Sequence, residues 1–378
     1  MRIAVPAESD KNETRVAATP ETVKKFKNLG AEVVVQSGAG AASGFADADY
    51  AAAGAAIADS AAGALDNAEI VLRVRRPSAA EVAGAARGAA VISIADPFGH
   101  EKELQELAAS GVAAFAMELM PRITRAQVMD VLSSQANIAG YRAVIDAAAD
   151  YGRAIPMMMT AAGTVPAAKI FVMGVGVAGL QAIATARRLG AIVSATDVRP
   201  ATKEQVESLG AKFIAVENDE FRQAETAGGY AKEMSPEYRQ AQAELVAAHI
   251  AKQDIVITTA LIPGRPAPRL ISAAMARSMR AGSVIIDLAA ERGGNCELTR
   301  PGETTIDSGV KIVGAVNLAG RLPATASSLY AKNLLAFVET LISKETRSLA
   351  IDWEDELVKA TALTRDGAVI DPRFAPKA

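Results

Sequence analysis

The amino-acid sequence predicts an α/β protein with two doubly wound parallel-sheet (Rossmann-like) domains joined by a long helix. The first reason is length, because 378 residues exceed what a single hydrophobic core usually organises. The second is that short apolar runs of strand length alternate with helical segments, as in a parallel sheet with helical crossovers. The third is a long helical pattern over residues 124–151, which separates two series of strands.

The first series begins with an apolar strand at residues 3–5 and a helix over residues 20–29. Thr19 is the expected N-cap of this helix, Pro20 suits its first position, and Gly30 follows its end. Further apolar runs of strand length complete the series, at residues 32–36, 70–74, 90–94 and 112–116.

The second series starts after Pro166, and its strands have the number and spacing of a dinucleotide-binding domain. A helix is expected over residues 330–342, and the more polar final residues are expected to return to the first domain. We therefore expect a discontinuous N-terminal domain, residues 1–126 and 321–378, and a second domain, residues 127–320. The expected strands of the second series are residues 170–173, 192–195, 213–215, 255–258, 284–287 and 311–314.

The long helical pattern over residues 124–151 contains no proline and one glycine, Gly140. A helix of this length would measure about 40 Å at 1.5 Å per residue and would connect the two domains. Thr124 and Gln127 have the spacing of a capping box, which predicts that the helix begins there.

The composition excludes several classes of function. A formal net charge of −3 gives no basic surface for nucleic acid or anionic lipid. The single cysteine, Cys296, allows no intrachain disulfide, and His100 and His249 lack ligand spacing, so we expect no metal site.

The N-terminus lacks a signal-peptide pattern, and charge, prolines and glycines interrupt the apolar stretch 154–186. We expect a soluble chain of a reducing compartment, without direct membrane insertion.

A glycine-rich motif, G-x-G-x-x-G, lies between a predicted strand and a predicted helix over residues 180–189. Gly174 would permit the tight turn, Gly176 would let a pyrophosphate approach the backbone, and Gly179 would allow close helix–strand packing. The N-terminus of the helix would favour the anion. The alternative is that the glycines serve only a tight strand–helix contact.

Asp197 ends the strand that follows this helix, where a carboxylate would accept hydrogen bonds from the adenosine ribose. A carboxylate at this point favours NAD over NADP, because a 2′-phosphate would meet a like charge. Arg199, two residues later, is the opposing feature, and we weigh Asp197 more heavily because it ends the strand.

Several segments resemble the NAD(H)-binding component of proton-translocating NAD(P) transhydrogenases, over nearly the whole chain. They are GVGVAGLQAIATA with the following ATDVR, and the segments MELMPRITRAQ, PMMMTAAGT and AETAGGYAKEM. The resemblance implies a homodimer that binds NAD(H) and exchanges hydride with NADP(H) on a partner subunit. It also implies a membrane-spanning subunit that carries proton translocation, so the chain is expected in the cytoplasm, peripheral on the inner membrane. The chain ends near Ala378 without membrane spans, as in forms where this component is a separate subunit.

The resemblance further implies site residues. In the family an Arg, a Gln, an Asp and a Ser line the nicotinamide end of the site, and they match Arg122, Gln127, Asp130 and Ser133. The last three are spaced i, i+3, i+6 and are expected on one face of the long helix. Without the resemblance, Gln127 would be a capping residue and Asp130 a favourable acid in the first turns. The expected cofactor-binding residues are Gly174, Val175, Gly176, Val177, Gly179, Asp197, Val198, Arg199, Gly229, Tyr230, Gln242 and Leu261.

Residues 217–237 form a polar segment without clear periodicity, and such long loops are usually functional or disordered. Gly228 and Gly229 could act as hinges, and the family uses the tyrosine that matches Tyr230 on a mobile lid over the nucleotide. Gln242 follows on the next helix and could face the adenosine. The alternative is a disordered surface insertion.

Two other functions remain open. Alanine dehydrogenase has the same fold, and Arg15 and Arg75 lie where that enzyme holds its substrate carboxylate. It also needs a catalytic histidine, but residues 95–97 read Ala-Asp-Pro and His100 is displaced by several positions. Amino-acid oxidation needs a proton acceptor, whereas hydride exchange between two nicotinamides does not. The second alternative is a non-enzymatic NAD-sensing module.

Overall fold

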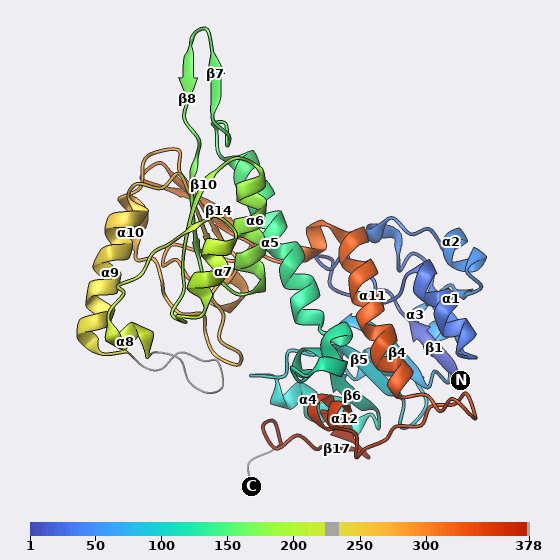
Figure 1. Cartoon of the computed structure of the whole chain (residues 1–378). Coiled ribbons are helices and arrows are strands. Elements are labelled where there is room, and N and C mark those ends of the chain that lie inside the picture. The colour runs from blue at the N-terminus through green and yellow to red at the C-terminus, as the bar shows by residue number, and fades with distance from the viewer. Residues whose placement is uncertain (224–233, 376–378) are drawn as a thin grey trace. The chain divides into compact units, whose positions relative to one another are not determined.

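The computed structural model describes residues 1–223 and 234–375, and the chain forms two compact units. Unit 1 comprises Met1–Gln135 and Ala319–Ala378, and unit 2 comprises Ala136–Leu318. Each unit has its own sheet, parallel in unit 1 and parallel except for one edge strand in unit 2, with helices on both sides (Figure 1). The predicted fold class, two doubly wound α/β domains, is confirmed.

The sheet of unit 1 has the strand order β3-β2-β1-β4-β5-β6, and all neighbouring strands are parallel. This is the 3-2-1-4-5-6 order of the doubly wound fold. Strand β3 was not predicted, because it has only three residues and none of them is fully buried. The strands are β1 Arg2–Val5, β2 Glu32–Gln36, β3 Ala56–Ala58, β4 Ile70–Arg75, β5 Ala90–Ile94 and β6 Ala113–Ala116.

In unit 1, the first helix, α1, begins where its capping residues predict. Thr19 and Thr22 form a capping box at the start of α1, and Gly30 follows the helix with a φ of +88°. Helix α11 begins earlier than predicted, with Pro323 in its first turn. The helices are α1 Pro20–Asn28, α2 Asp47–Ala52, α3 Ala61–Leu65, α4 Glu101–Ala109, α11 Pro323–Thr340 and α12 Glu356–Thr361.

The C-terminal segment belongs to the core of unit 1. The ring of Phe337 on α11 meets that of Phe115 on β6 edge-on, with centroids 5.5 Å apart. The backbone N–H of Leu363 donates to the carbonyl of Ala114 at 2.8 Å. A short hairpin of β16 (Thr364–Arg365) and β17 (Ala368–Val369) follows.

The long helix, α5, spans Val131–Asp150 and runs from unit 1 into unit 2. The prediction that it starts at Thr124 is wrong, because Thr124–Met129 form a 3-10 helix, η4. Asp130 separates the two with an extended ψ of 90°, so Gln127, Asp130 and Ser133 do not share one helical face. The predicted capping box of Thr124 and Gln127 is also wrong, since no side chain caps η4.

The sheet of unit 2 has the order β11-β10-β9-β12-β13-β15-β14. Its first six strands are parallel in the same doubly wound order, and β14 is an antiparallel edge strand that was not predicted. The predicted strand at residues 213–215 is shorter and starts earlier, as β11. The strands are β9 Lys169–Met173, β10 Ile192–Thr196, β11 Lys212–Phe213, β12 Ile255–Thr258, β13 Val284–Asp287, β14 Thr304–Asp307 and β15 Val310–Gly314.

The helices of unit 2 cover this sheet. A Cβ on Gly140 would lie 2.1 Å from the carbonyl oxygen of Ala178, so this glycine allows α5 and α6 to cross closely. Helix α6 starts at Val177, three residues before the predicted start. The helices are α6 Val177–Arg188, α7 Thr202–Ser208, α8 Asp219–Arg222, α9 Pro236–Ile250 and α10 Ala273–Arg277.

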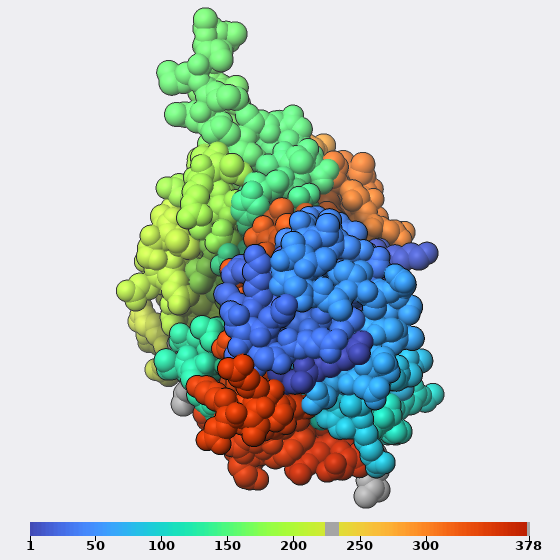
Figure 2. Space-filling view, turned by 90° about the vertical axis from the view of Figure 1, so that its right-hand side faces the viewer, coloured from blue at the N-terminus to red at the C-terminus, as the bar shows by residue number. Residues whose placement is uncertain are grey.

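A hairpin of β7 (Met158–Thr160) and β8 (Gly163–Val165) projects from unit 2 (Figures 1 and 2). Met157, Met158 and Met159 are exposed along it, Met159 to 79%. The sequence did not predict the hairpin, since its side chains contribute to no core. Among the residues that the structure describes, no helix has the length and apolar character needed to cross a bilayer.

Candidate functional site

The glycine-rich turn of unit 2 connects β9 to α6. Gly174 has a φ of +97°, a conformation that L side chains rarely adopt. A Cβ on Gly179 would lie 1.9 Å from the carbonyl oxygen of Gly174, so this position tolerates no side chain. A Cβ on Gly176 would meet no heavy atom within 4 Å. The fold itself therefore requires glycine at positions 174 and 179. Gly176, in contrast, keeps open a space above the backbone.

The N-terminus of α6 is suited to an anion. Gly176 is its N-cap and supplies no side-chain hydrogen bond, so no side chain caps the first backbone N–H groups. The helix has twelve residues, and its dipole adds a partial positive charge at this end. A diphosphate that approaches Gly176 would meet N–H donors and a favourable field. The glycine motif therefore fits a dinucleotide.

Asp197 follows β10 and is held by four hydrogen bonds. Its Oδ2 accepts from the backbone N–H of Val175 at 2.7 Å and from Nη2 of Arg199 at 3.0 Å. Its Oδ1 accepts from the backbone N–H and from Nε of Arg199, both at 2.9 Å. Asp197 is thus joined to the glycine-rich turn through Val175 and is also paired with Arg199.

Two exposed apolar side chains follow the strands on either side of β9. Val198, after β10, is 61% exposed, and Leu261, after β12, is 55% exposed. Both strands are parallel to β9, so these residues follow the carboxyl ends of the sheet, where doubly wound proteins bind ligands. Such surfaces are suited to the faces of an adenine ring.

Gln242 on α9 lies beside the same edge of the sheet. Its Oε1 accepts from the backbone N–H of Val216 at 2.8 Å, and its Nε2 donates to Oγ1 of Thr196 at 3.3 Å. Gln242 therefore fixes the end of β10, next to Asp197. Gly229 and Tyr230, predicted in a lid, lie outside the described residues, as does Gly228.

The four residues predicted at the nicotinamide all belong to unit 1. Asp130 and Ser133 lie together, because Asp130 Oδ1 accepts from the backbone N–H of Ser133 at 2.9 Å. Arg122 and Gln127 are exposed on the preceding segment. Neither is bound into the core, so both side chains are available at the surface of unit 1.

Asn333 is a residue that the sequence did not single out. From α11, its Nδ2 donates to the carbonyl of Val128 at 2.7 Å, and its Oδ1 accepts from Oγ of Ser134 at 2.8 Å. It thereby fixes the backbone directly after Gln127. The available signal was a polar residue on the buried side of an apolar helix.

The two arginines that would hold an amino-acid carboxylate already have a carboxylate partner. Arg15 donates through Nε and Nη2 to the two carboxylate oxygens of Glu13, each at 2.7 Å, and Arg75 Nε donates to Glu13 at 2.8 Å. Burial raises the pKa of Glu13, but the hydrogen bonds and charges of the arginines outweigh it and lower the pKa overall. Glu13 is therefore ionised at neutral pH and neutralises part of this positive charge.

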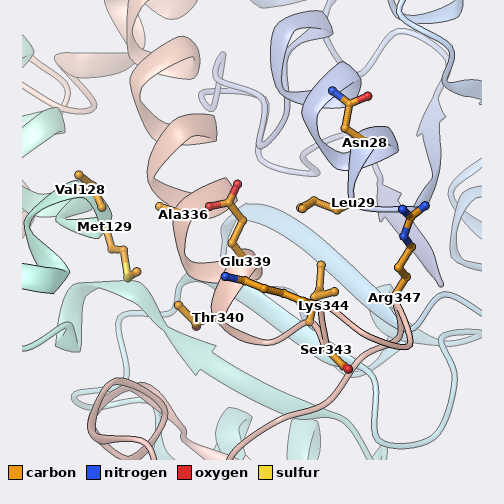
Figure 3. A pocket seen from close by; sticks show the side chains of 11 residues that line it. Asn28, Leu29, Val128, Met129, Ala336, Glu339, Thr340, Ser343, Lys344 and Arg347 are labelled. Carbon is orange, nitrogen blue, oxygen red and sulfur yellow. The ribbon is translucent and has the colours of Figure 1, made fainter.

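A surface cavity of about 840 Å³ lies on unit 1, and Val128 and Met129, the two residues between Gln127 and Asp130, are among those that line it (Figure 3). Its charged side chains are Glu339, Lys344 and Arg347, from the end of α11 and the segment after it. The predicted site residues themselves are not among its lining residues. Across residues 1–223 and 234–375, no group of three or more His, Cys, Asp and Glu side chains is placed to hold a metal ion.

Comparisons with known proteins agree on one family. The family model "Alanine dehydrogenase/PNT, N-terminal domain" matches residues 4–139, and "Alanine dehydrogenase/PNT, C-terminal domain" matches residues 143–372. An NAD(P) transhydrogenase subunit alpha protein of Rhodospirillum rubrum is 55% identical to this chain, over 98% of each chain.

Two solved structures resemble the whole chain. A transhydrogenase from Sinorhizobium meliloti is 61% identical, with a TM-score of 0.89 over 98% of this chain and all of that one. An L-alanine dehydrogenase is 25% identical, with a TM-score of 0.82 over 99% of this chain and 98% of that one.

Proposed function

Because the chain belongs to the alanine dehydrogenase/PNT family, among the NAD(P) transhydrogenase alpha subunits, we propose that it binds NAD(H) and exchanges hydride with NADP(H) on a partner subunit. The observation that carries the proposal is the glycine-rich turn of unit 2. There, Gly176 leaves the backbone open to a diphosphate, and Asp197 is hydrogen-bonded to the turn itself. The remaining cofactor-binding residues are proposed to be Gly174, Val175, Val177, Gly179, Val198, Arg199, Gly229, Tyr230, Gln242 and Leu261.

Arg122, Gln127, Asp130 and Ser133 are proposed to act at the nicotinamide. NADH supplies the hydride, from C4 of its nicotinamide ring. The work of the chain is to hold that ring in one orientation and to keep it accessible to a second nicotinamide. Since no proton leaves the reacting carbon, these residues need not include an acid or a base.

The partners are proposed to be an NADP(H)-binding subunit and a membrane-spanning subunit that carries proton translocation. The chain would then lie in the cytoplasm, peripheral on the inner membrane. A homodimer is proposed as well. Its support is the β7–β8 hairpin, whose exposed Met157, Met158 and Met159 offer an apolar surface for a second copy.

A fluorescence titration with NADH and NADPH tests the nucleotide assignment. NADH is expected to bind more tightly, because a 2′-phosphate would meet the Asp197 carboxylate. Asp197→Ala is expected to weaken NADH binding by about 1–3 kcal/mol, the range for losing a buried hydrogen-bonding partner. Comparable dissociation constants for the two nucleotides would contradict the assignment.

Alanine dehydrogenase activity is the second candidate, supported by the structural match to that enzyme. Against it, Arg15 and Arg75 are both paired with Glu13. The side chain of His100 is 37% exposed and contacts Glu103 at 3.4 Å. The test is incubation with L-alanine and NAD⁺, in which we expect no NADH to form.

A further inference from the structure

We propose that the Arg199 guanidinium holds the two acceptor positions of Asp197 that the ribose diol of NADH needs, so that nucleotide binding must displace it. The inference rests on the proposed function, because it assumes that the adenosine ribose binds at Asp197. What is added is that the ribose competes with the Arg199 guanidinium for Asp197. Arg199 thereby sets the nucleotide affinity, because it controls access to the Asp197 carboxylate.

A carboxylate can accept hydrogen bonds at about four lone-pair positions. On Oδ2 of Asp197, one position is taken by the backbone N–H of Val175 and one by Nη2 of Arg199. On Oδ1, one is taken by the backbone N–H of Arg199 and one by its Nε. Four donors therefore fill the four positions.

These four donors fall into two kinds. The two backbone N–H groups belong to the turn after β9 and to the turn after β10, so the fold fixes them. The two guanidinium donors belong to one side chain that is 34% exposed, whereas the side chain of Asp197 is 7% exposed. Only the arginine pair can leave without a change of the backbone.

Departure of the guanidinium frees one position on each oxygen. A ribose diol offers two neighbouring hydroxyl donors, which matches one free position on Oδ1 and one on Oδ2. The guanidinium and the diol therefore compete for the same two positions. A competitor that covers the site lowers the apparent affinity by the fraction of time the site is free.

The pairing also explains why an arginine is useful at this point. It partners a carboxylate that is largely buried, and such a charge is costly when left alone. Its Nη2 also donates to the carbonyl of Val175 at 3.2 Å, which ties the glycine-rich turn to Asp197. The turn and the acceptor thus stay aligned until the ribose replaces the guanidinium.

The test uses adenosine, because a neutral probe removes the attraction of Arg199 for the phosphates. The affinity for adenosine is measured by displacing bound NADH and following the NADH fluorescence. The measurement is made on the unmodified chain and on Arg199→Met. Arg300→Met is the control, since it removes one charge from an exposed position of the same unit. We expect Arg199→Met to bind adenosine about threefold or more tightly than the unmodified chain, as expected when a competitor is removed. The control should not change.

Two further comparisons identify the cause. With 3′-deoxyadenosine, which lacks one hydroxyl, the gain from Arg199→Met should shrink. In an Asp197→Asn background, where one of the two oxygens no longer accepts, the gain should also shrink. Arg199→Lys, which keeps the charge but not the fork of donors, should give a smaller gain and serves if the methionine variant does not fold.

Unchanged or weaker adenosine binding by folded Arg199→Met, with NADH still bound, would overturn the inference and leave the proposed function intact. Failure of the unmodified chain to bind NADH at all would instead refute the proposed function.

Discussion

The carboxylate of Asp130 accepts a hydrogen bond from the backbone N–H of Ser133 at 2.9 Å, and it also accepts from the Ser133 hydroxyl. Asp130 is therefore the residue that ends the 3-10 helix η4 and caps α5. A residue with this structural task can also serve the nicotinamide. The two roles are separable by substitution, because a cap needs only an acceptor oxygen.

Asp130→Ala is expected to lower stability by about 1 kcal/mol, the usual cost of losing an N-cap. Asp130→Asn keeps an acceptor oxygen, so its melting temperature should stay close to that of the unmodified chain. Both should slow hydride transfer in the assembled complex if the carboxylate acts at the nicotinamide. Thermal melting and single-turnover transfer measure the two effects. A normal rate of hydride transfer in Asp130→Asn would mean that Asp130 only caps α5 and does not act at the nicotinamide.

Gln127→Asn is expected to slow hydride transfer without destabilising the chain. No side chain caps η4, so shortening Gln127 removes no capping bond, and exposed substitutions usually change stability by less than about 0.5 kcal/mol. A small misplacement of the reacting atoms can cost on the order of a hundredfold in rate. Gln105→Asn, the same change on the exposed face of α4, is the control. Equal transfer rates for the two variants would remove Gln127 from the site.

Gly176→Ala and Gly179→Ala are expected to fail in different ways. Gly176 has a φ of −83° and open space at its Cβ position, so alanine should leave the stability nearly unchanged and weaken NADH binding. Gly179 has the carbonyl oxygen of Gly174 in the way, so alanine should cost about 1–3 kcal/mol through overpacking. Melting and NADH titration of both variants decide. Normal NADH affinity in Gly176→Ala would mean that the diphosphate does not approach there.

His249 is expected to make the stability of the chain depend on pH. Burial lowers its pKa below the usual 6.5, and the nearby charges of Lys212, Lys252 and Lys169 add to the effect. Its ring also shares a hydrogen bond with Ser194 Oγ at 2.8 Å and meets the ring of Phe171 edge-on. Because the folded pKa is the lower one, the unfolded chain binds the proton more readily. The contribution of His249 to the stability of the folded chain is therefore complete above about pH 6.5. It is lost as the pH falls through the pKa of the folded state.

The measurement is the free energy of unfolding at about pH 7.5 and about pH 5.5, on either side of the usual histidine pKa. His249→Gln should show a smaller loss on acidification than the unmodified chain. His100→Gln, at the other histidine of the sequence, is the control. Identical pH dependence in both variants would exclude His249 as a source.

Apolar runs located the central strands well, because buried parallel strands are apolar on both faces. β2, β5, β12 and β13 have the bounds predicted for them. Exposed elements gave no such signal, so β14 and the β7–β8 hairpin were not predicted. The break at Asp130 was also missed, because spacings of three residues fit a 3-10 helix and an α-helix equally well.

For the candidate site, the sequence located the glycine-rich turn and placed Asp197 at the end of the next strand, but it did not predict the hydrogen bond between Val175 and Asp197. The pairing of Asp197 with Arg199 depends on rotamers, and a sequence does not specify those. The sequence likewise did not predict that Asn333 holds the backbone after Gln127, because Asn333 and its partner Val128 are far apart along the chain.

The most direct measurement of the central claim follows a deuterium label. NADH carrying deuterium at the transferable C4 position is mixed with NADP⁺, this chain and the NADP(H)-binding subunit, and the NADPH formed is analysed by mass spectrometry. We expect labelled NADPH from the mixture, none from either protein alone, and much less when Gly176→Ala replaces the unmodified chain. A mixture in which both nucleotides are bound but no deuterium reaches NADPH would contradict hydride transfer by this protein.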